Sequence, residues 1–194
     1  MENNLNNICK EDKILETDRL YLRRLCPEDF DALCIILQDA EVMYAYEHAF
    51  SDAEVLEWQN RQLERYEKYG FGLWAVIDKE NQALIGQCGL TMQAVGDRQV
   101  MEIGYLFQKA YWHHGYAIEA AAACKKYAFE TLGAREVYSI IRDNNLPSQK
   151  VAVRNGMSVR GSLVKHYYGM DMPHLVYSVN REEHKGNVQE GFIC

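Results

Sequence analysis

Hydrophobic and polar residues alternate along the chain with periods that change from the two-residue repeat of strands to the 3.6-residue repeat of helices. The segment "LETDRLYLRRL" (15–25) has the two-residue period and predicts a strand. Pro27 then occupies a position that the first turn of a helix tolerates, and the apolar residues after it have helical spacing. The residues that predict this amphipathic helix are Phe30, Leu33, Cys34 and Leu37.

A longer helix is predicted to begin after Ser51 and to end at Gly70. Ser51 has Glu54 three residues beyond it, as in a capping box, and glycine is the usual residue after a helix. Leu56, Leu63 and Tyr66 are expected to share one face of this helix. Polar turns then separate three predicted strands, which indicates an antiparallel meander. These strands are expected at 71–78, 83–92 and 99–108.

The second half of the chain contains the one parallel crossover that the pattern predicts. A helix from Gly115 to Leu132 joins strand 99–108 to a strand at 136–141, which makes a β-α-β unit. A short helix and two strands follow, at 146–155, 158–168 and 173–180. We therefore predict a mixed α/β fold with a mostly antiparallel sheet flanked by helices. The expected organisation is a flexible segment (1–13), one domain (14–180) and a polar tail (181–194) that frays.

Composition narrows the class of protein. The 194 residues suit one soluble domain, and no apolar run reaches the ~18–20 residues that a membrane span needs. The polar N-terminus does not read as a signal or transit peptide, and the six cysteines form no Cys-x-x-Cys pair. Reduced thiols and a cytoplasmic location are therefore expected.

The distribution of charge points to anions in one part of the chain. The net charge of −7 argues against general nucleic-acid binding, which needs a basic surface. Residues 109–160 nevertheless carry a net charge of +4, so the remainder carries −11. An anion site in the second half and a cation-attracting region elsewhere would explain the asymmetry, and so would chance variation of solvated surface.

The stretch "YWHHGYAIEA" (111–120) places a glycine where a strand and a short loop run into a helix. The first N–H groups of a helix lack intrahelical partners and lie at the positive end of its dipole, so Gly115 predicts an anion site of backbone amides. Walker and Rossmann glycine patterns are both absent. His113 and His114 are expected to serve through their amides. Adjacent residues make a poor metal pair and no third ligand is evident, so no metal is expected.

Six segments in a fixed order resemble the GNAT acetyltransferase superfamily, and in particular its ribosomal-protein (Rim-type) N-acetyltransferase branch. They are "ETDRLYLRRL", "EIGYLF", Trp112–Ala117, Glu119–Ala120, Asn145–Ser148 and Val151–Met157. The resemblance covers residues 14–180. It implies an acyl-CoA N-acyltransferase fold and acetyl-coenzyme A as cosubstrate. Trp112 departs from the usual glutamine or arginine but is familiar in the Rim-type branch.

The resemblance also implies which residues contact the cofactor. The loop from His113 to Ile118 would cradle the pyrophosphate, the end of strand 99–108 would pair with the pantetheine arm, and Asn145 would contact the cofactor after the next strand. The implied cofactor residues are Tyr105, Leu106, Phe107, His113, His114, Gly115, Tyr116, Ala117, Ile118, Asn145 and Ser148.

Acetyl transfer to an amine requires a base for the ammonium group, polarisation of the thioester carbonyl and stabilisation of the leaving thiolate. Glu102 is the leading base because it lies on the strand expected to meet the thioester; a solvent-facing or ion-paired carboxylate is the alternative. Glu47 and His48 are second choices. The resemblance suggests the backbone N–H near Leu106 for the carbonyl and Ser148 for the thiolate, and a hydroxyl that merely caps a helix is the alternative for Ser148.

Two catalytic positions of the family hold other residues here. Ala152 stands where many members have a tyrosine, and Ile140 where some branches have a glutamate. A thiolate can leave without a dedicated acid, because its unperturbed pKa is about 8.5.

The sequence thus predicts an N-acetyltransferase that acts on a primary amine, either a protein N-terminus or a small molecule, by direct attack in a ternary complex. A non-catalytic acyl-coenzyme A binding or regulatory module on the same fold is the alternative. The absent glycine patterns disfavour a nucleotide-binding protein. Neither nucleic acid nor a membrane is expected as a partner, and both a monomer and a homodimer are compatible with the residues.

Overall fold

The computed structural model describes residues 13–167 and 169–184. Its strands form one sheet in the order β1-β2-β3-β4-β5-β6-β8-β7. The strands are β1 (Lys13–Glu16), β2 (Leu20–Arg23), β3 (Leu73–Asp78), β4 (Leu84–Val95), β5 (Arg98–Phe107), β6 (Glu136–Arg142), β7 (Ser158–Tyr167) and β8 (Met170–Asn180). The α-helices are α2 (Phe30–Leu37), α3 (Asp52–Tyr69), α4 (Tyr116–Glu130) and α5 (Leu146–Arg154).

The mixed α/β fold with a mostly antiparallel sheet is confirmed. β5 pairs with β6 in parallel, whereas the β1–β2, β2–β3, β3–β4, β6–β8 and β7–β8 pairs are antiparallel. The described residues cluster into two compact units, one formed by residues 13–91 with Gly104–Cys124 and the other by Met92–Ile103 with the described residues from Lys125 onward. No helix in the described ranges is both long and apolar enough to cross a membrane.

The first predicted strand is wrong in one respect. The segment 15–25 is interrupted by a turn at 17–19, so that β1 and β2 form an antiparallel pair instead of one strand. In this turn the backbone N–H of Thr17 donates to the carbonyl of Leu20 at 2.9 Å, and the Thr17 hydroxyl accepts a hydrogen bond from the Leu20 N–H at 3.0 Å. A threonine hydroxyl that bonds the backbone favours such a turn over a continuous strand.

Helix α3 has the predicted ends but a different buried face. The Ser51 hydroxyl accepts from the Glu54 N–H, the Glu54 carboxylate accepts from the Ser51 N–H, and Gly70 ends the helix with φ +78°. Leu56, expected on the same face as Tyr66, is 49% exposed. The buried residues are Val55, Trp58, Gln59, Gln62 and Tyr66, of which Tyr66 belongs to the expected face.

Two buried glutamines explain why the apolar pattern misplaced this face. Gln59 donates from Nε2 to the carbonyl of Cys26 at 2.7 Å, and Gln62 accepts from the N–H of Leu73 at 3.1 Å. A buried amide that bonds the backbone is stable in a core, although its polarity makes the position read as solvent-facing.

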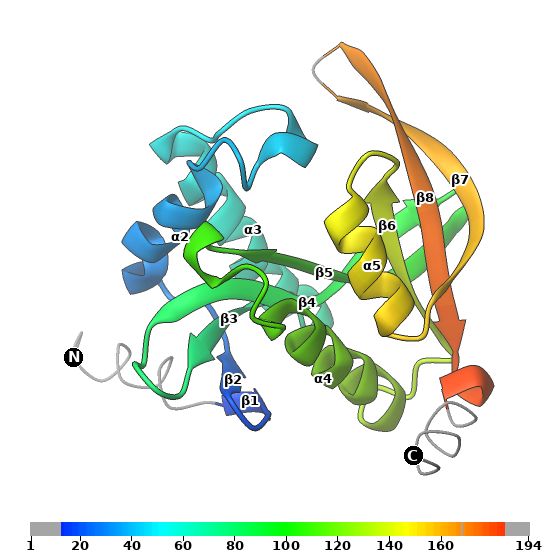
Figure 1. Cartoon of the computed structure of the whole chain (residues 1–194), viewed down its shortest axis with the longest axis horizontal. Coiled ribbons are helices and arrows are strands. Elements are labelled where there is room, and N and C mark those ends of the chain that lie inside the picture. Colours follow the sequence, from blue (N-terminus) through cyan, green and yellow to red (C-terminus); the bar gives the residue numbers. More distant parts are fainter. Residues whose placement is uncertain (1–12, 168, 185–194) are drawn as a thin grey trace. The chain divides into compact units, whose positions relative to one another are not determined.

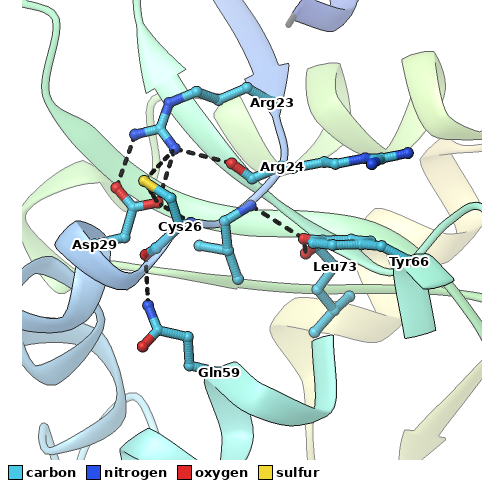
Figure 2. A network of polar contacts seen from close by, with 8 residues as sticks. Arg23, Arg24, Cys26, Asp29, Gln59, Tyr66 and Leu73 are labelled. Atoms are coloured by element: carbon cyan, nitrogen blue, oxygen red, sulfur yellow. Dashed lines mark hydrogen bonds and ion pairs between the residues drawn. The ribbon is translucent and has the colours of Figure 1, made fainter. Parts of the chain in front are cut away.

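A buried ion pair fixes the junction between β2 and α2 (Figure 2). The Arg23 guanidinium donates to both carboxylate oxygens of Asp29 at 2.7 Å, and each of the two residues is 5% exposed. Asp29 also accepts from the N–H of Cys26 at 2.9 Å, and the Tyr66 hydroxyl accepts from the N–H of Leu25 at 3.2 Å. Because these polar groups are satisfied by one another, the network holds α3 against the strand without leaving an unpaired charge.

In the second unit, β8 lies between β6 and β7, and α5 lies beside β6 (Figure 1). Val100, Tyr138, Ile140 and Val176 form a buried cluster there.

The predicted tail begins with four helical residues that belong to the fold, since Arg181 donates to the carbonyls of Phe129 at 2.6 Å and Ala134 at 3.2 Å. Most of the segment predicted to be flexible (residues 1–12) and residues 185–194 lie outside the described residues.

Candidate active site

The predicted anion loop follows the carboxyl end of β5. A single 3-10 turn (Lys109–Tyr111) leads into it, and the Trp112 indole N–H donates back to the carbonyl of Phe107 at 2.9 Å. The N–H of Glu119 donates to the carbonyl of Gly115 at 3.1 Å, which makes Gly115 the residue at which helix α4 begins. The N–H groups of the first turn, including those of Ala117 and Ile118, have no intrahelical partner in such a geometry.

Two residues of the loop have left-handed backbone conformations. Gly115 has φ +82° and His113 has φ +64°. A Cβ added to Gly115 would lie 3.5 Å from Nη2 of Arg19, an ordinary contact, so the backbone conformation and not crowding favours glycine at this position. His113 is a less common residue in this region, and no pattern in the sequence predicts its strained backbone. A turn that contains such residues can present consecutive amides to an anion, as anion-binding loops do.

Arg19, in the turn between β1 and β2, braces this loop. Its guanidinium donates to the Glu119 carboxylate (Nε to Oε2, 2.7 Å) and to the carbonyl of His114 at 2.9 Å, and it stacks on the Tyr116 ring at 4.4 Å. The Thr17 hydroxyl donates to the same carboxylate at 2.6 Å. The "ETDRL" segment at the start of the chain therefore acts on the loop a hundred residues later.

The Glu119 carboxylate is held ionised by these contacts. Its partial burial opposes ionisation, but hydrogen bonds from Thr17 and from the backbone and side chain of Arg19 outweigh the burial and lower the pKa of Glu119. The charges of Arg19 and Glu119 largely cancel, so the pair contributes shape to the loop more than net positive charge.

In the second unit, Glu102 lies where β5 and β6 pair. Glu102 is in register with Tyr138, and its Oε1 accepts from the N–H of Ile140 at 3.1 Å. The Ser139 hydroxyl donates to the carbonyl of Ile103 at 3.0 Å. Side chains thus add links between two parallel strands. Glu102 is part-buried, and one of its carboxylate oxygens bonds a backbone amide.

Asn145 and Ser148 stand at the start of α5. The Asn145 side chain accepts from the N–H of Ser148 at 3.1 Å, which makes Asn145 the N-cap of the helix. The side-chain amide of Asn145 therefore caps the helix. The two second-choice residues lie in the first unit, where Glu47 has φ +71° and His48 contacts the Glu54 carboxylate at 2.8 Å.

The predicted residues therefore fall into two sets. The first unit contains Tyr105–Phe107 and the loop from His113 to Ile118. The second unit contains Glu102, Asn145 and Ser148. Sequence patterns missed the bracing by Arg19; its only signal was the "ETDRL" segment itself. Within the described ranges, no group of three or more His, Cys, Asp or Glu side chains is arranged to hold a metal ion.

Comparison with known proteins identifies the family. Residues 19–158 match the acetyltransferase (GNAT) domain family. A protein named YkkB, uncharacterised, from Bacillus subtilis (strain 168) is 36% identical over 74% of this chain and 84% of its own length. YoaA, an uncharacterised N-acetyltransferase of the same organism, is 28% identical over 86% of this chain and 96% of its own length.

Solved structures share the fold. An acetyltransferase (GNAT family) from Bacillus anthracis superimposes with a TM-score of 0.76 at 24% identity, covering 87% of this chain and 98% of its own. RimL, a ribosomal L7/L12 alpha-N-protein acetyltransferase solved in complex with coenzyme A, gives a TM-score of 0.71 at 17% identity over 87% of this chain and 98% of its own. The chain belongs to the GNAT acetyltransferase family.

Proposed function

We propose that the protein transfers the acetyl group of acetyl-coenzyme A to a primary amine by direct attack, the amine being a protein N-terminus or a small molecule. The observation that carries the proposal is the loop at Gly115, where left-handed backbone at His113 and Gly115 precedes the 15-residue helix α4 and Arg19 braces the turn. The coenzyme A bound in the RimL structure supports the choice of cosubstrate. A cytoplasmic location and a monomeric or homodimeric state complete the proposal.

The residues present fit a pyrophosphate at this loop. The amides from His113 to Ile118 would hold its oxygens at the positive end of α4. Tyr105, Leu106 and Phe107 offer the backbone of the end of β5 to the pantetheine arm, and Asn145 is the proposed contact after β6. Acetyl-coenzyme A supplies the activated acetyl group, and the amide of Leu106 is the proposed donor to its carbonyl.

Glu102 is the proposed carboxylate at the ammonium group of the acceptor. Some branches of the family carry a glutamate where this chain has Ile140. Here the carboxylate of Glu102, from the neighbouring strand, contacts the backbone of Ile140 itself. A carboxylate is therefore retained at this position from a different residue. It would attract the cationic amine and either take its proton or hold it for another base.

The departing thiolate has fewer proposed partners. Ala152, which replaces the tyrosine of many members, is only 2% exposed and offers no proton. Ser148, on the first turn of α5, is the proposed donor. We expect Ser148→Ala to lower kcat by less than tenfold, because a thiolate is a good leaving group without help.

A thiol-release assay tests the proposal against a panel of peptides with Ala or Ser N-termini, polyamines and free amino acids. Thiol release that depends on one class of amine supports an acetyltransferase and identifies its acceptor. Coenzyme A binding without turnover on any amine would instead favour the non-catalytic acyl-coenzyme A module, a reading that the missing tyrosine favours.

A further inference from the structure

A buried histidine on β8 has the arrangement of a general base, although no sequence pattern marked it. His174 is 8% exposed, and its Nδ1 lies 2.7 Å from the carbonyl oxygen of Met172. A carbonyl oxygen can only accept a hydrogen bond, so Nδ1 must carry the proton. The lone pair of the neutral ring is then on Nε2, and no described residue hydrogen-bonds that atom.

Strand register places His174 on the same face of the sheet as Glu102. Glu102 faces Tyr138 across β5 and β6, and Tyr138 faces Ser178 across β6 and β8. Residues that face each other share a side of the sheet, and the two-residue period carries that side along β8 from Ser178 to His174. Both side chains therefore project from one face.

The backbones of Glu102 and His174 are two strands and four residues apart, and the Glu102 side chain shortens this gap by reaching the Ile140 N–H. His174 is paired with Arg142, two residues beyond the Ile140 N–H that binds Glu102. Two residues span about 7 Å along a strand, and neighbouring strands lie about 4.8 Å apart. The imidazole thus lies at the carboxyl end of β6, which is one of the two strands of the parallel pair.

The surroundings of His174 keep its ring neutral. Burial lowers the pKa of His174, and the nearby charges of Lys165 on β7 and Arg142 on β6 lower it further. The hydrogen bond to Met172 and the charge of Asp143 act in the opposite direction but do not reverse the result. Glu102 and Arg98 on β5 and Glu136 on β6 also project from this face, and both Arg98 and Glu136 hydrogen-bond the Tyr138 hydroxyl. The ring is consequently unprotonated at neutral pH and free to accept a proton.

We propose that His174 is the general base that deprotonates the acceptor amine, with Glu102 holding the ammonium group beside it; this rests on the proposed acetyltransferase function. Nε2 takes one proton from the ammonium, directly or across one water. The free amine attacks the acetyl carbonyl, the C–N bond forms and the C–S bond breaks, and the second nitrogen proton goes to the thiolate. The imidazolium then returns its proton to solvent, so the products are an acetamide, a thiol and one released proton.

An imidazole suits this task better than a carboxylate. Proton transfer is most efficient when the pKa of the base lies near the working pH, and free imidazole titrates at about 6.5 against about 4.3 for glutamate. Glu102 also spends one oxygen on the Ile140 amide. In the proposal, Glu102 therefore binds the positively charged ammonium group and His174 accepts the proton that this group loses.

The test compares His174→Asn and His174→Gln with the wild-type protein, and uses His166→Asn as the matched control. Asparagine keeps a donor at the position of Nδ1 but has no base at Nε2. His166 lies on the same hairpin, exposed and paired with Asp171 at 2.8 Å. Steady-state rates are measured from pH 5 to 9 with the amine that releases the most thiol, and coenzyme A binding is followed by melting temperature.

We expect both His174 variants to lose about 100-fold in kcat, with coenzyme A binding retained. The fall of kcat/KM at acid pH should disappear in them and persist in His166→Asn and Glu102→Gln. An unchanged acid limb in His174→Asn would overturn the role of His174 while leaving the proposed function standing. Absence of turnover in the wild-type protein with every amine would overturn both.

A measurement on the wild-type protein covers the case in which the variants fail to fold. Nitrogen-15 NMR of the imidazoles reports which nitrogen carries the proton and at what pH the ring charges. We expect the His174 ring to be neutral at pH 7 with its proton on Nδ1. A ring that is charged at pH 7, or that carries its proton on Nε2, would contradict the assignment.

Discussion

Arg19 connects three parts of the candidate cofactor loop through one side chain. It bonds the Glu119 carboxylate on α4 and the carbonyl of His114 before the helix, and it covers the ring of Tyr116. Exposed ion pairs contribute at most about 1 kcal/mol to stability. The ion pair between Arg19 and Glu119 matters more for binding, because Arg19 holds several positions of the loop in place. A preorganised loop loses less entropy when it binds a ligand.

Replacement of Arg19 should therefore act on binding more than on folding. We expect Arg19→Gln to weaken coenzyme A binding about tenfold, which corresponds to about 1.4 kcal/mol. Arg61→Gln is the matched control, since Arg61 makes an exposed ion pair with Glu57 one turn away on α3. Isothermal titration of the two variants provides the comparison. Equal affinities in both would show that the loop does not depend on its brace.

The left-handed glycine at the start of α4 permits a second test with an internal control. Gly115 and Gly96 have φ +82° and φ +57°, and added Cβ atoms would meet Arg19 at an ordinary distance in the first case and nothing within 4 Å in the second. Each alanine variant should lose about 1 kcal/mol of stability from backbone strain. Only Gly115→Ala should also weaken coenzyme A binding. A similar loss of affinity in Gly96→Ala would mean that strain alone, wherever it is placed, explains the effect.

At the scale of elements, helix α3 depends on a reciprocal cap that titrates. The Glu54 carboxylate accepts from the backbone and hydroxyl of Ser51 at 2.8 Å and contacts His48 at the same distance. The Ser51 backbone, the His48 ring and the Ser51 hydroxyl lower the pKa of Glu54 to about 2. The carboxylate thus favours the folded chain only while it is ionised.

The lowered pKa of Glu54 defines the pH range over which its contribution to stability is lost. A carboxylate whose pKa is lowered by folding stabilises the protein fully above its unfolded pKa, and the contribution is lost as pH falls through the folded value. For Glu54 the window extends from 4.5 down to about 2. Wild-type protein should melt above Glu54→Gln at pH 6, and the two melting temperatures should converge only as pH falls through about 2. Glu57→Gln, altered on the exposed side of the same helix, should show no such convergence.

Local signals in the sequence predicted most helices and strands. The features that were not predicted depend on contacts between residues far apart in the sequence. Ser51, Glu54 and Gly70 fixed the ends of α3 because caps involve neighbours in sequence. The burial of Gln59 and Gln62 depends on backbone partners far along the chain, so the apolar pattern placed Leu56 on the wrong face.

In the candidate site, too, residues with a local signal could be predicted and residues defined by distant contacts could not. Gly115 and Asn145 could be predicted, because a helix start carries its own signal. Arg19 and His174 could not: the first acts through Glu119, a hundred residues away, and the second is defined by its register with Arg142. Nothing within a few residues of either distinguishes it from an ordinary turn arginine or strand histidine.

For the whole molecule, cosubstrate binding and folding stability are coupled. A ligand that binds only the folded chain stabilises it by about 2.7 kcal/mol at one hundred times its Kd. Each kcal/mol raises the melting temperature of a chain of this size by about 2–4 °C, so saturating coenzyme A should raise it by roughly 5–11 °C.

ATP shares the adenine nucleotide and phosphates but lacks the pantetheine arm proposed to pair with the end of β5. It should therefore give a much smaller shift at the same concentration. A shift with ATP as large as that with coenzyme A would mean that the loop at Gly115 recognises phosphates alone, and an acyl carrier would no longer be the required partner of this fold.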